Sequence, residues 1–419
     1  MALAHEPSVV VVRGATANLV SEAPELAKAP AAFRTAVNLV AKGWTRGAVS
    51  FVLPSGRELR VEGEVPGPEA RLVVHDYRFM NRVLSAGDIG FAEGYMAGEW
   101  DTPDLSALLS AMSLNFDGIQ RVALGSPLAW LVNFVAHMMN DNTRKGSKRN
   151  IHAHYDLGNA FYSRWLDPTM TYSSARYERP GQALTEAQRN KYRALAQSMD
   201  LRPEHHVLEI GCGWGGFAEF AARDLGARVT GITISKEQYD FAARRLFEQG
   251  LTERAEIRLV DYRDVEGQFD RVASIEMFEA VGERHWPAYF SKVRDTLKAG
   301  GRAGLQIITI RNELFATYRR RADFIQKYIF PGGMLPSERR LKEETAKAGL
   351  SWGGISRFGQ NYADTLAEWG RRFEGAWDDI RRLGFDERFR RLWKFYLSYC
   401  EAGFRTERTD VVQLSLARG

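Results

Sequence analysis

Short apolar runs alternate with longer amphipathic stretches through the second half of the chain. The apolar runs predict β-strands over residues 206–210, 228–232, 257–260, 270–275, 302–310 and 411–416. The amphipathic stretches predict helices over residues 216–225, 236–249 and 287–297. Strands that alternate with helices of about ten to fifteen residues are typical of a parallel, doubly wound α/β sheet. The region from 310 to 410 is rich in aromatic residues and arginine, and we expect it to be mostly helical.

The first third of the chain follows a different pattern, which predicts a smaller α+β domain over residues 33–140. Its strand-like runs lie at residues 48–53, 57–62 and 71–74, and its one clear helical segment lies at residues 76–85. An N-terminal extension, residues 1–32, precedes this domain. A polar stretch, residues 141–150, carries four basic residues and has no periodicity, which is typical of a linker. We therefore expect the doubly wound domain over residues 151–419, with an insertion at about 311–370.

The composition excludes several classes of protein. Of the 419 residues 45% are hydrophobic and 26% are charged, which is typical of a folded globular protein. The only two cysteines, Cys212 and Cys400, exclude a disulfide-rich scaffold. The longest apolar stretches, such as 128–139, are too short to span a bilayer, and no signal-peptide pattern is present, so we expect a cytoplasmic protein. The net charge of +5 suits an anionic partner but does not choose between a membrane surface and nucleic acid.

A glycine-rich turn directly after the strand 206–210 is the strongest local signal. Gly211, Gly213 and Gly215 stand between a strand and a helix, where the backbone must turn tightly and approach a ligand closely. Dinucleotide sites prefer G-x-G-x-x-G, which places a pyrophosphate at the helix N-terminus. With Glu209 in front, the pattern here is E-x-G-x-G-x-G. It suits S-adenosylmethionine (SAM), a cofactor with no phosphate.

Polar residues after the next two strands complete the predicted cofactor site. Thr233 and Gln238 follow the second strand, where we expect contacts with the ribose. Asp261 and Tyr262 follow the third strand, where we expect contacts with the adenine. Together with the glycine turn, these residues resemble the core of a class I SAM methyltransferase.

Further motifs, in order along the chain, resemble the cyclopropane-fatty-acyl-phospholipid synthase family. They are residues 154–162 (HYDLGNAFY), 172–174 (YSS), 277–282 (MFEAVG), 327–333 with 335–337, and 358–362 (FGQNY). Residues 90–100 and 395–419 resemble parts of its full-length bacterial members, so the resemblance spans roughly residues 75 to 419. It implies methyl transfer from SAM to the cis double bond of an unsaturated phospholipid chain, held in a dry apolar slot.

The resemblance also implies roles for individual residues. Tyr172 and Ser173 join the cofactor contacts. After methylation leaves a carbocation, the family uses a bound bicarbonate ion as the base. Glu279 and Tyr362 match the residues beside that ion, and Ser174 and Gln306 match two further positions of its pocket. The implied catalytic residues are therefore Glu279, Tyr362, Ser174 and Gln306.

Three departures from the family pattern affect this pocket. Ser174 replaces a cysteine, Ala280 replaces a histidine after Glu279, and Gln306 replaces a histidine. Because glutamine cannot take up a proton, the sequence leaves open whether bicarbonate is bound. We predict that a proton leaves the chain, which gives a methyl-branched unsaturated product. The alternative is that the pocket still holds bicarbonate and the product is a cyclopropane.

The predicted partners are unsaturated phospholipid chains and the inner face of the membrane, where the enzyme would be peripheral. The N-terminal domain would contact lipid or a second subunit, because full-length members of the family suggest a homodimer. We predict no metal: His152 and His154 stand two apart, but His154 belongs to the HYD motif. A nucleic-acid methyltransferase is a remote alternative that lacks both an Asn/Asp-Pro-Pro-Tyr motif and a recognisable nucleic-acid module. A non-catalytic lipid-binding relative is another.

Overall fold

The computed structural model describes residues 9–13, 24–123 and 157–419. The expectations for the linker 141–150, the apolar stretch 128–139, and the histidines at 152 and 154 lie outside these residues. Contacts divide the chain into two units, a larger one built on the predicted doubly wound sheet and a smaller one that contains the N-terminal α+β region.

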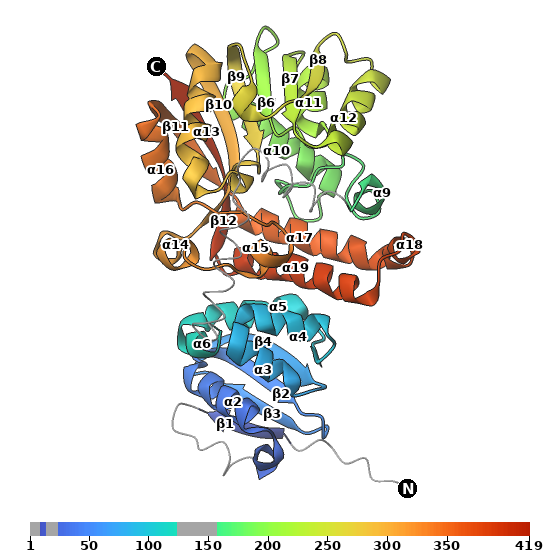
Figure 1. Cartoon of the computed structure of the whole chain (residues 1–419), viewed down its shortest axis with the longest axis vertical. Helices are drawn as coiled ribbons and strands as arrows, with labels where there is room; N and C mark the ends of the chain where they lie inside the picture. The colour runs from blue at the N-terminus through green and yellow to red at the C-terminus, as the bar shows by residue number, and fades with distance from the viewer. Residues whose placement is uncertain (1–8, 14–23, 124–156) are drawn as a thin grey trace. The chain divides into compact units, whose positions relative to one another are not determined.

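The larger unit is built on a seven-stranded sheet with the strand order β11-β12-β10-β9-β6-β7-β8 (Figure 1). The strands are β6 (His206–Ile210), β7 (Arg228–Thr233), β8 (Ala255–Leu259), β9 (Phe269–Ile275), β10 (Leu297–Ile310), β11 (Leu350–Arg357) and β12 (Thr409–Arg418). From β10 to β8 each neighbouring pair is parallel, whereas β12 is antiparallel to both β10 and β11. The prediction of a parallel, doubly wound core is confirmed.

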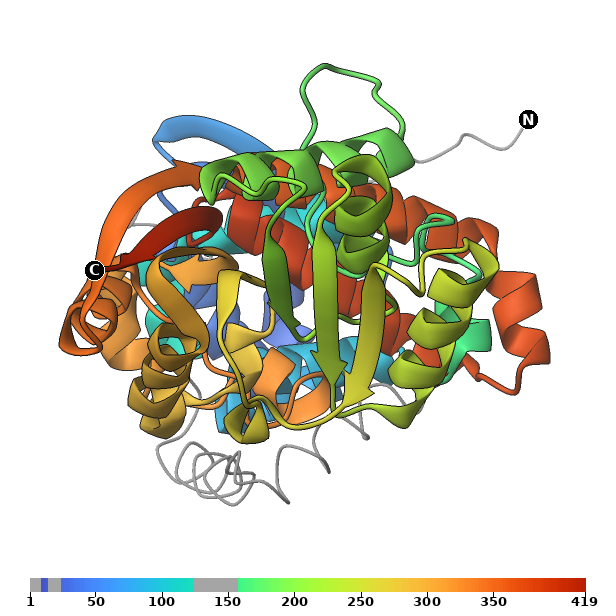
Figure 2. The same cartoon turned by 90° about the horizontal axis from the view of Figure 1, so that it is seen from above.

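Helices cover both faces of this sheet. Figure 2 shows the molecule from above, with the strands between the two layers of helices. One core contains Phe217 and packs beneath α10 (Leu184–Ser198), α11 (Gly216–Asp224) and α12 (Lys236–Glu248). The other contains Trp286 and packs beneath α13 (Trp286–Thr296) and α16 (Glu338–Lys347). Strand β6 supplies both cores: Val207 belongs to the first and Leu208 to the second. This is the alternation expected of a strand that is buried on both faces.

The region between β10 and β12 is mostly helical, as predicted. It contains α14 (Asn312–Tyr318), α15 (Phe324–Tyr328), α16, α17 (Gly359–Gly375), α18 (Trp377–Arg382) and α19 (Glu387–Arg405). The sequence pattern does not predict β11, which contains Gly353 and Gly354 and is mostly exposed. This edge strand is held by its pairing with β12 rather than by a local preference for β-structure.

The smaller unit contains a five-stranded sheet with the order β1-β3-β2-β4-β5. Its strands are β1 (Val9–Arg13), β2 (Arg46–Val52), β3 (Glu58–Glu62), β4 (Val65–Val74) and β5 (Trp100–Asp101). Its helices include α2 (Ala31–Gly43), α3 (Arg78–Ala86), α4 (Asp88–Met96), α5 (Leu105–Leu114) and α6 (Phe116–Ala123). The predicted α+β character is confirmed.

The contacts of α19 place this C-terminal helix in the smaller unit, although the sequence analysis expected all of residues 151–419 in one domain. Arg391 donates to the carbonyl oxygen of Trp100 at 2.9 Å. Its guanidinium lies 4.0 Å from the ring centroid of Tyr95, and Ser106 donates to the Glu401 carboxylate. Trp100 and Arg391 are 291 positions apart in the sequence. Local periodicity shows that α19 has an apolar face, but it does not show what that face packs against.

Across the described ranges, no helix is long and apolar enough to cross a membrane. Among the same residues, no group of three or more His, Cys, Asp or Glu side chains is arranged to hold a metal ion.

Candidate active site

The predicted site residues lie at the carboxyl ends of adjacent parallel strands. Glu209 is near the end of β6, Thr233 ends β7 and Asp261 follows β8. Glu279 lies in the short segment after β9, and Gln306 lies in the second half of β10. Because β9 pairs with β6, the predicted cofactor residues on β6, β7 and β8 adjoin the predicted catalytic residues on β9 and β10. This edge is where doubly wound sheets bind ligands.

The glycine turn requires glycine for two different reasons. Gly211, Gly213 and Gly215 adopt φ values of 80°, 53° and 81°, which side chains rarely allow. A Cβ atom on Gly211 would also lie 2.6 Å from Cγ of Met277, whereas one on Gly213 would meet nothing within 4 Å. The turn is thus packed against the segment that follows β9 on one side and is open beside Gly213.

Glu209 carries an unpartnered oxygen beside this turn. Its side chain is buried, and its Oε2 has no hydrogen-bond partner within the described residues. Burial raises the pKa of Glu209 well above its usual value. A buried carboxyl oxygen without a donor fits a ligand that brings one, as the amino group of SAM would.

The two predicted pairs after β7 and β8 lie where the sequence places them. Thr233 donates to the side-chain oxygen of Gln238 at 2.8 Å, and both side chains are buried. Asp261 accepts from Arg263 Nε at 2.8 Å and from Nη2 at 2.6 Å. Burial raises the pKa of Tyr262 to about 12. Asp261 is therefore half of a local ion pair, so a cofactor would meet it together with Arg263.

A carboxylate that the sequence analysis missed joins three of the predicted catalytic residues. Glu276 Oε1 accepts from the backbone N–H of Ser174 at 2.9 Å and from Nε2 of Gln306 at 2.7 Å. Its Oε2 accepts from the Tyr362 hydroxyl at 2.7 Å. Glu276 stands one residue before the family-like segment 277–282, directly after an apolar strand. That position at a strand end was the available signal.

Gln413 sets the orientation of the Gln306 side-chain amide by a hydrogen bond to its oxygen. Gln413 Nε2 donates to Gln306 Oε1 and to the backbone oxygen of Lys191, both at 3.0 Å. With its oxygen engaged in this way, Gln306 presents its amide nitrogen to Glu276. Gln306 therefore holds and orients a carboxylate.

A buried lysine interacts with the charge of this cluster, and the sequence does not single it out either. Lys191 is fully buried on α10, and its Nζ donates to the Ser173 hydroxyl at 2.6 Å. Burial lowers the pKa of Lys191 to about 7, against the opposing effect of the Glu276 charge. Burial raises the pKa of Glu276, and the Lys191 charge and the three hydrogen bonds oppose that rise.

Glu279, the glutamate that the sequence selects, lies in a different environment. Its Oε1 accepts from the backbone N–H of Ile308, and its buried Oε2 has no partner in the described part of the chain. Burial, and after it the charge of Glu276, raises the pKa of Glu279 to about 8. Near neutral pH Glu279 is therefore mostly protonated. The Tyr362 hydroxyl, which we expected beside Glu279, donates to Glu276.

The variant Glu279→Gln should weaken the pH dependence of stability. Because folding raises the pKa of Glu279 from 4.5 to about 8, the folded state binds this proton more tightly than the unfolded state. Its contribution to stability is therefore present at low pH and is lost progressively as the pH rises through this window. Relative to the variant, the wild type should lose on the order of 2–4 kcal/mol. Urea unfolding of both proteins across the window measures the difference.

The matched control for this experiment is Glu266→Gln, which removes an exposed carboxylate in the same unit. Its stability curve should run parallel to that of the wild type. If the Glu279→Gln curve is also parallel to the wild type, the shifted pKa is contradicted.

Aromatic rings surround the residues beside the carboxylate cluster. The centroid of the Tyr172 ring lies 5.4 Å from that of Tyr162, 5.6 Å from that of Trp165 and 5.3 Å from that of Trp369. Trp369 in turn lies 6.1 Å from Tyr362, edge to face. Aromatic faces exclude water and stabilise positive charge. This wall suits a site in which a cation develops on an apolar substrate.

Comparisons with known proteins identify a family and several relatives. Residues 142–414 match the family model described as mycolic acid cyclopropane synthetase. The chain is 40% identical over 348 residues to the tuberculostearic acid methyltransferase UfaA1 of Mycobacterium tuberculosis (strain ATCC 25618 / H37Rv), with 80% of each chain covered. It is 34% identical over 390 residues to the cyclopropane-fatty-acyl-phospholipid synthase of Escherichia coli (strain K12), with 90% of this chain and 94% of the relative covered. A crystal structure of mycolic acid cyclopropane synthase CmaA1 complexed with SAH and CTAB aligns with a TM-score of 0.61 at 30% identity. The alignment covers 65% of this chain and 98% of that one.

Proposed function

The chain belongs to the mycolic acid cyclopropane synthetase family, and from this premise we propose that it methylates the cis double bond of an unsaturated acyl chain in membrane phospholipid. The enzyme is a SAM-dependent methyltransferase. The observation that carries the choice of substrate is the Glu276 carboxylate, held by Ser174, Gln306 and Tyr362 beside an aromatic wall. A base and an apolar, cation-stabilising wall are what methylation of an alkene requires.

SAM, when bound, supplies an electrophilic methyl group. The residues that would hold it are Glu209, the glycines 211, 213 and 215, Thr233, Gln238, Asp261, Tyr262, Tyr172 and Ser173. Because an alkene is a weak nucleophile, the chain must align it closely and keep water out. Trp165 and Trp369, both fully buried, would form the dry wall. Tyr362 and Gln306 would keep Glu276 in one orientation.

We infer that the product is a methyl-branched unsaturated chain. Gln306 occupies the position of a family histidine, and as a neutral amide it neither gives nor takes a proton. The relatives include the tuberculostearic acid methyltransferase UfaA1, which supports this outcome. A cyclopropane product is the second candidate, and the similarity to the Escherichia coli synthase favours it.

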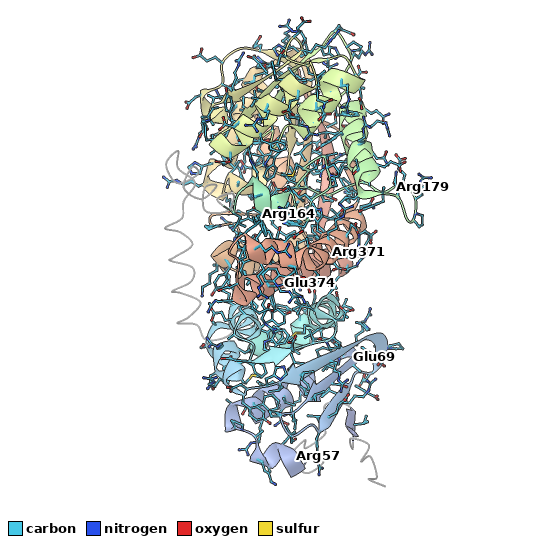
Figure 3. The ribbon with its side chains drawn as sticks, turned by 90° about the vertical axis from the view of Figure 1, so that its right-hand side faces the viewer. Arg57, Glu69, Arg164, Arg179, Arg371 and Glu374 are labelled. Atoms are coloured by element: carbon cyan, nitrogen blue, oxygen red, sulfur yellow. The ribbon has the colours of Figure 1, made fainter. Side chains whose placement is uncertain are left out.

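We also infer that the enzyme works at the inner face of the membrane, because its substrate chains lie there. A net charge of +5 favours contact with anionic lipid. In the larger unit the side chain of Arg179 extends outward from the ribbon (Figure 3). A homodimer remains a proposal that rests on the full-length relatives.

The proposed function is tested with SAM carrying a trideuterated methyl group and vesicles of cis-monounsaturated phospholipid. We expect the label in the acyl chains, which are released and read by mass spectrometry. Three retained deuterium atoms mean that the proton left the chain and would support the branched alkene. Two mean that the new carbon lost one, as in a ring or an exocyclic methylene, and would contradict the branched alkene with an internal double bond. Proton NMR of the lipid made with unlabelled SAM then separates these two products, because only the exocyclic methylene has vinyl protons. An unlabelled lipid would overturn the proposed function.

A further inference from the structure

The carboxylate of Glu276 uses the hydrogen-bond donors that would hold a bicarbonate ion. The family resemblance assigns such an ion to the pocket of Ser174, Gln306, Tyr362 and Glu279. In this structure the first three of these residues all donate to Glu276, at 2.7–2.9 Å. A carboxylate presents the same two-oxygen edge as bicarbonate, so these donors are satisfied without a further ion.

A separate bicarbonate ion does not fit this arrangement. Ser174 and Gln306 have no exposed surface, and Tyr362 is 7% exposed, so a free anion would have to displace Glu276 to reach them. It would also lie against the Glu276 charge in a site of low dielectric, where like charges repel strongly. Glu276 itself is only half-buried. The three donor residues thus have less exposed surface than Glu276, whose carboxylate they hold.

The backbone shows that Glu276 is held in a costly conformation. Its φ of 49° lies in the left-handed region, which glutamate rarely adopts. A non-glycine residue at such a φ is strained and persists where the surrounding structure enforces it. Here the hydrogen bonds to both carboxylate oxygens offset that cost.

The geometry points to Glu276 as a built-in replacement for bicarbonate, namely the base that removes the proton after methyl transfer. This inference rests on the proposed function. The alkene electron pair forms the new carbon–carbon bond to the methyl group, the sulfur–methyl bond of the donor breaks with its electron pair going to sulfur, and the adjacent chain carbon becomes cationic. Glu276 then takes a proton from the carbon next to that cation. The electron pair of the broken C–H bond forms the double bond of the product, and Glu276 becomes a carboxylic acid.

The charged groups around Glu276 favour this role. Lys191 is the buried cation whose charge opposes the rise in the pKa of Glu276. Glu279, the nearby carboxyl group, is mostly protonated near neutral pH because its pKa is raised to about 8. Glu209 is buried as well, and its pKa lies well above its usual value. Of the three carboxyl groups, Glu276 is the one that accepts hydrogen bonds on both oxygens, and these bonds and the Lys191 charge oppose the rise in its pKa.

The test combines two variants with control of the bicarbonate concentration. Wild type should label lipid equally well, within about twofold, in carbonate-free buffer and in added bicarbonate. Glu276→Gln should lose about 10²- to 10⁴-fold in rate, the usual contribution of a general base, and should not respond to bicarbonate. Glu276→Gly should lose as much in carbonate-free buffer. Added bicarbonate should then raise the rate of Glu276→Gly at least about tenfold, and the rate should saturate with the bicarbonate concentration. The reason is that glycine leaves the hydrogen-bond donors free and readily adopts the backbone angle.

Three readouts separate the ways in which this inference could fail. SAM affinity should be unchanged in Glu276→Gln, thermal unfolding should show that this variant is folded, and the exposed-site variant Glu266→Gln should keep full activity. Wild type that methylates lipid only with bicarbonate present, or Glu276→Gln that keeps its rate, would overturn the role of Glu276 while leaving the proposed function intact. Wild type that labels no lipid in either buffer would overturn the proposed function itself. If Glu276→Gly does not fold, the wild-type and Glu276→Gln measurements still decide the matter.

Discussion

Trp369→Ala should lower the free energy of unfolding by about 3–5 kcal/mol, the usual cost of truncating a buried tryptophan. The side chain is completely buried, and its ring centroid lies 5.3–6.1 Å from those of Tyr172, Trp165 and Tyr362. Removal would leave a cavity behind Tyr362 and loosen the hydroxyl that donates to Glu276. The rate of lipid methylation should therefore fall by at least about tenfold, since small misplacements of catalytic groups are costly. Urea unfolding and the labelled-lipid assay measure the two effects.

The matched variant is Trp369→Phe. The indole N–H of Trp369 has no hydrogen-bond partner among the residues that the structure describes, so phenylalanine loses packing volume but no bond. It should cost about 1–2 kcal/mol and keep most of the activity. If Trp369→Ala and Trp369→Phe lose equal amounts of stability and activity, packing of the aromatic ring at this position is not the source of those losses.

Gly211→Ala should weaken SAM binding by about tenfold or more, from two additive causes. The φ of 80° costs a side-chain-bearing residue about 1–2 kcal/mol. The new Cβ would also lie 2.6 Å from Cγ and 2.9 Å from Cβ of Met277. An atom so close to the backbone cannot move aside freely. The strain should therefore move the segment that carries Glu276 and Glu279. Calorimetric titration with SAM and thermal unfolding measure the change.

The control variant Gly250→Ala separates the cost of a side chain at a positive φ from the steric clash of the new Cβ atom with Met277. Gly250 has a φ of 67°, and an added Cβ there would meet nothing within 4 Å. This variant should lose the same 1–2 kcal/mol of stability and bind SAM as tightly as wild type does. Wild-type affinity in Gly211→Ala as well would contradict the close packing of the glycine turn against Met277.

The sequence predicts secondary structure well where local periodicity determines it. The strand 206–210, the glycine turn and the alternation of strands and helices after it are confirmed. The edge strand β11 is not predicted, because its glycines and exposed side chains have little preference of their own for β-structure. The placement of α19 is not predicted either, since its partner helices lie near the other end of the chain.

In the candidate site, too, some residues can be recognised from the sequence and others cannot. The glycine turn, Thr233, Gln238 and Asp261 are recognisable because each follows a strand at a fixed offset. Ser174, Gln306 and Tyr362 are recognisable through motifs that resemble a family. Glu276 and Lys191 are not, because a glutamate after a strand and a lysine on a helix are common in any sequence.

By itself, then, the sequence determined the class of fold, the cofactor and the family, since these depend on short patterns of backbone geometry and side-chain type. The tertiary structure decided which carboxylate faces Ser174, Gln306 and Tyr362. It also decided which cation lies behind that carboxylate and which unit holds the last long helix. The physical reason is that hydrogen bonds and charge interactions act over a few ångströms. Chain folding alone brings Glu276 together with Gln306, 30 positions away, and with Ser174, 102 positions away.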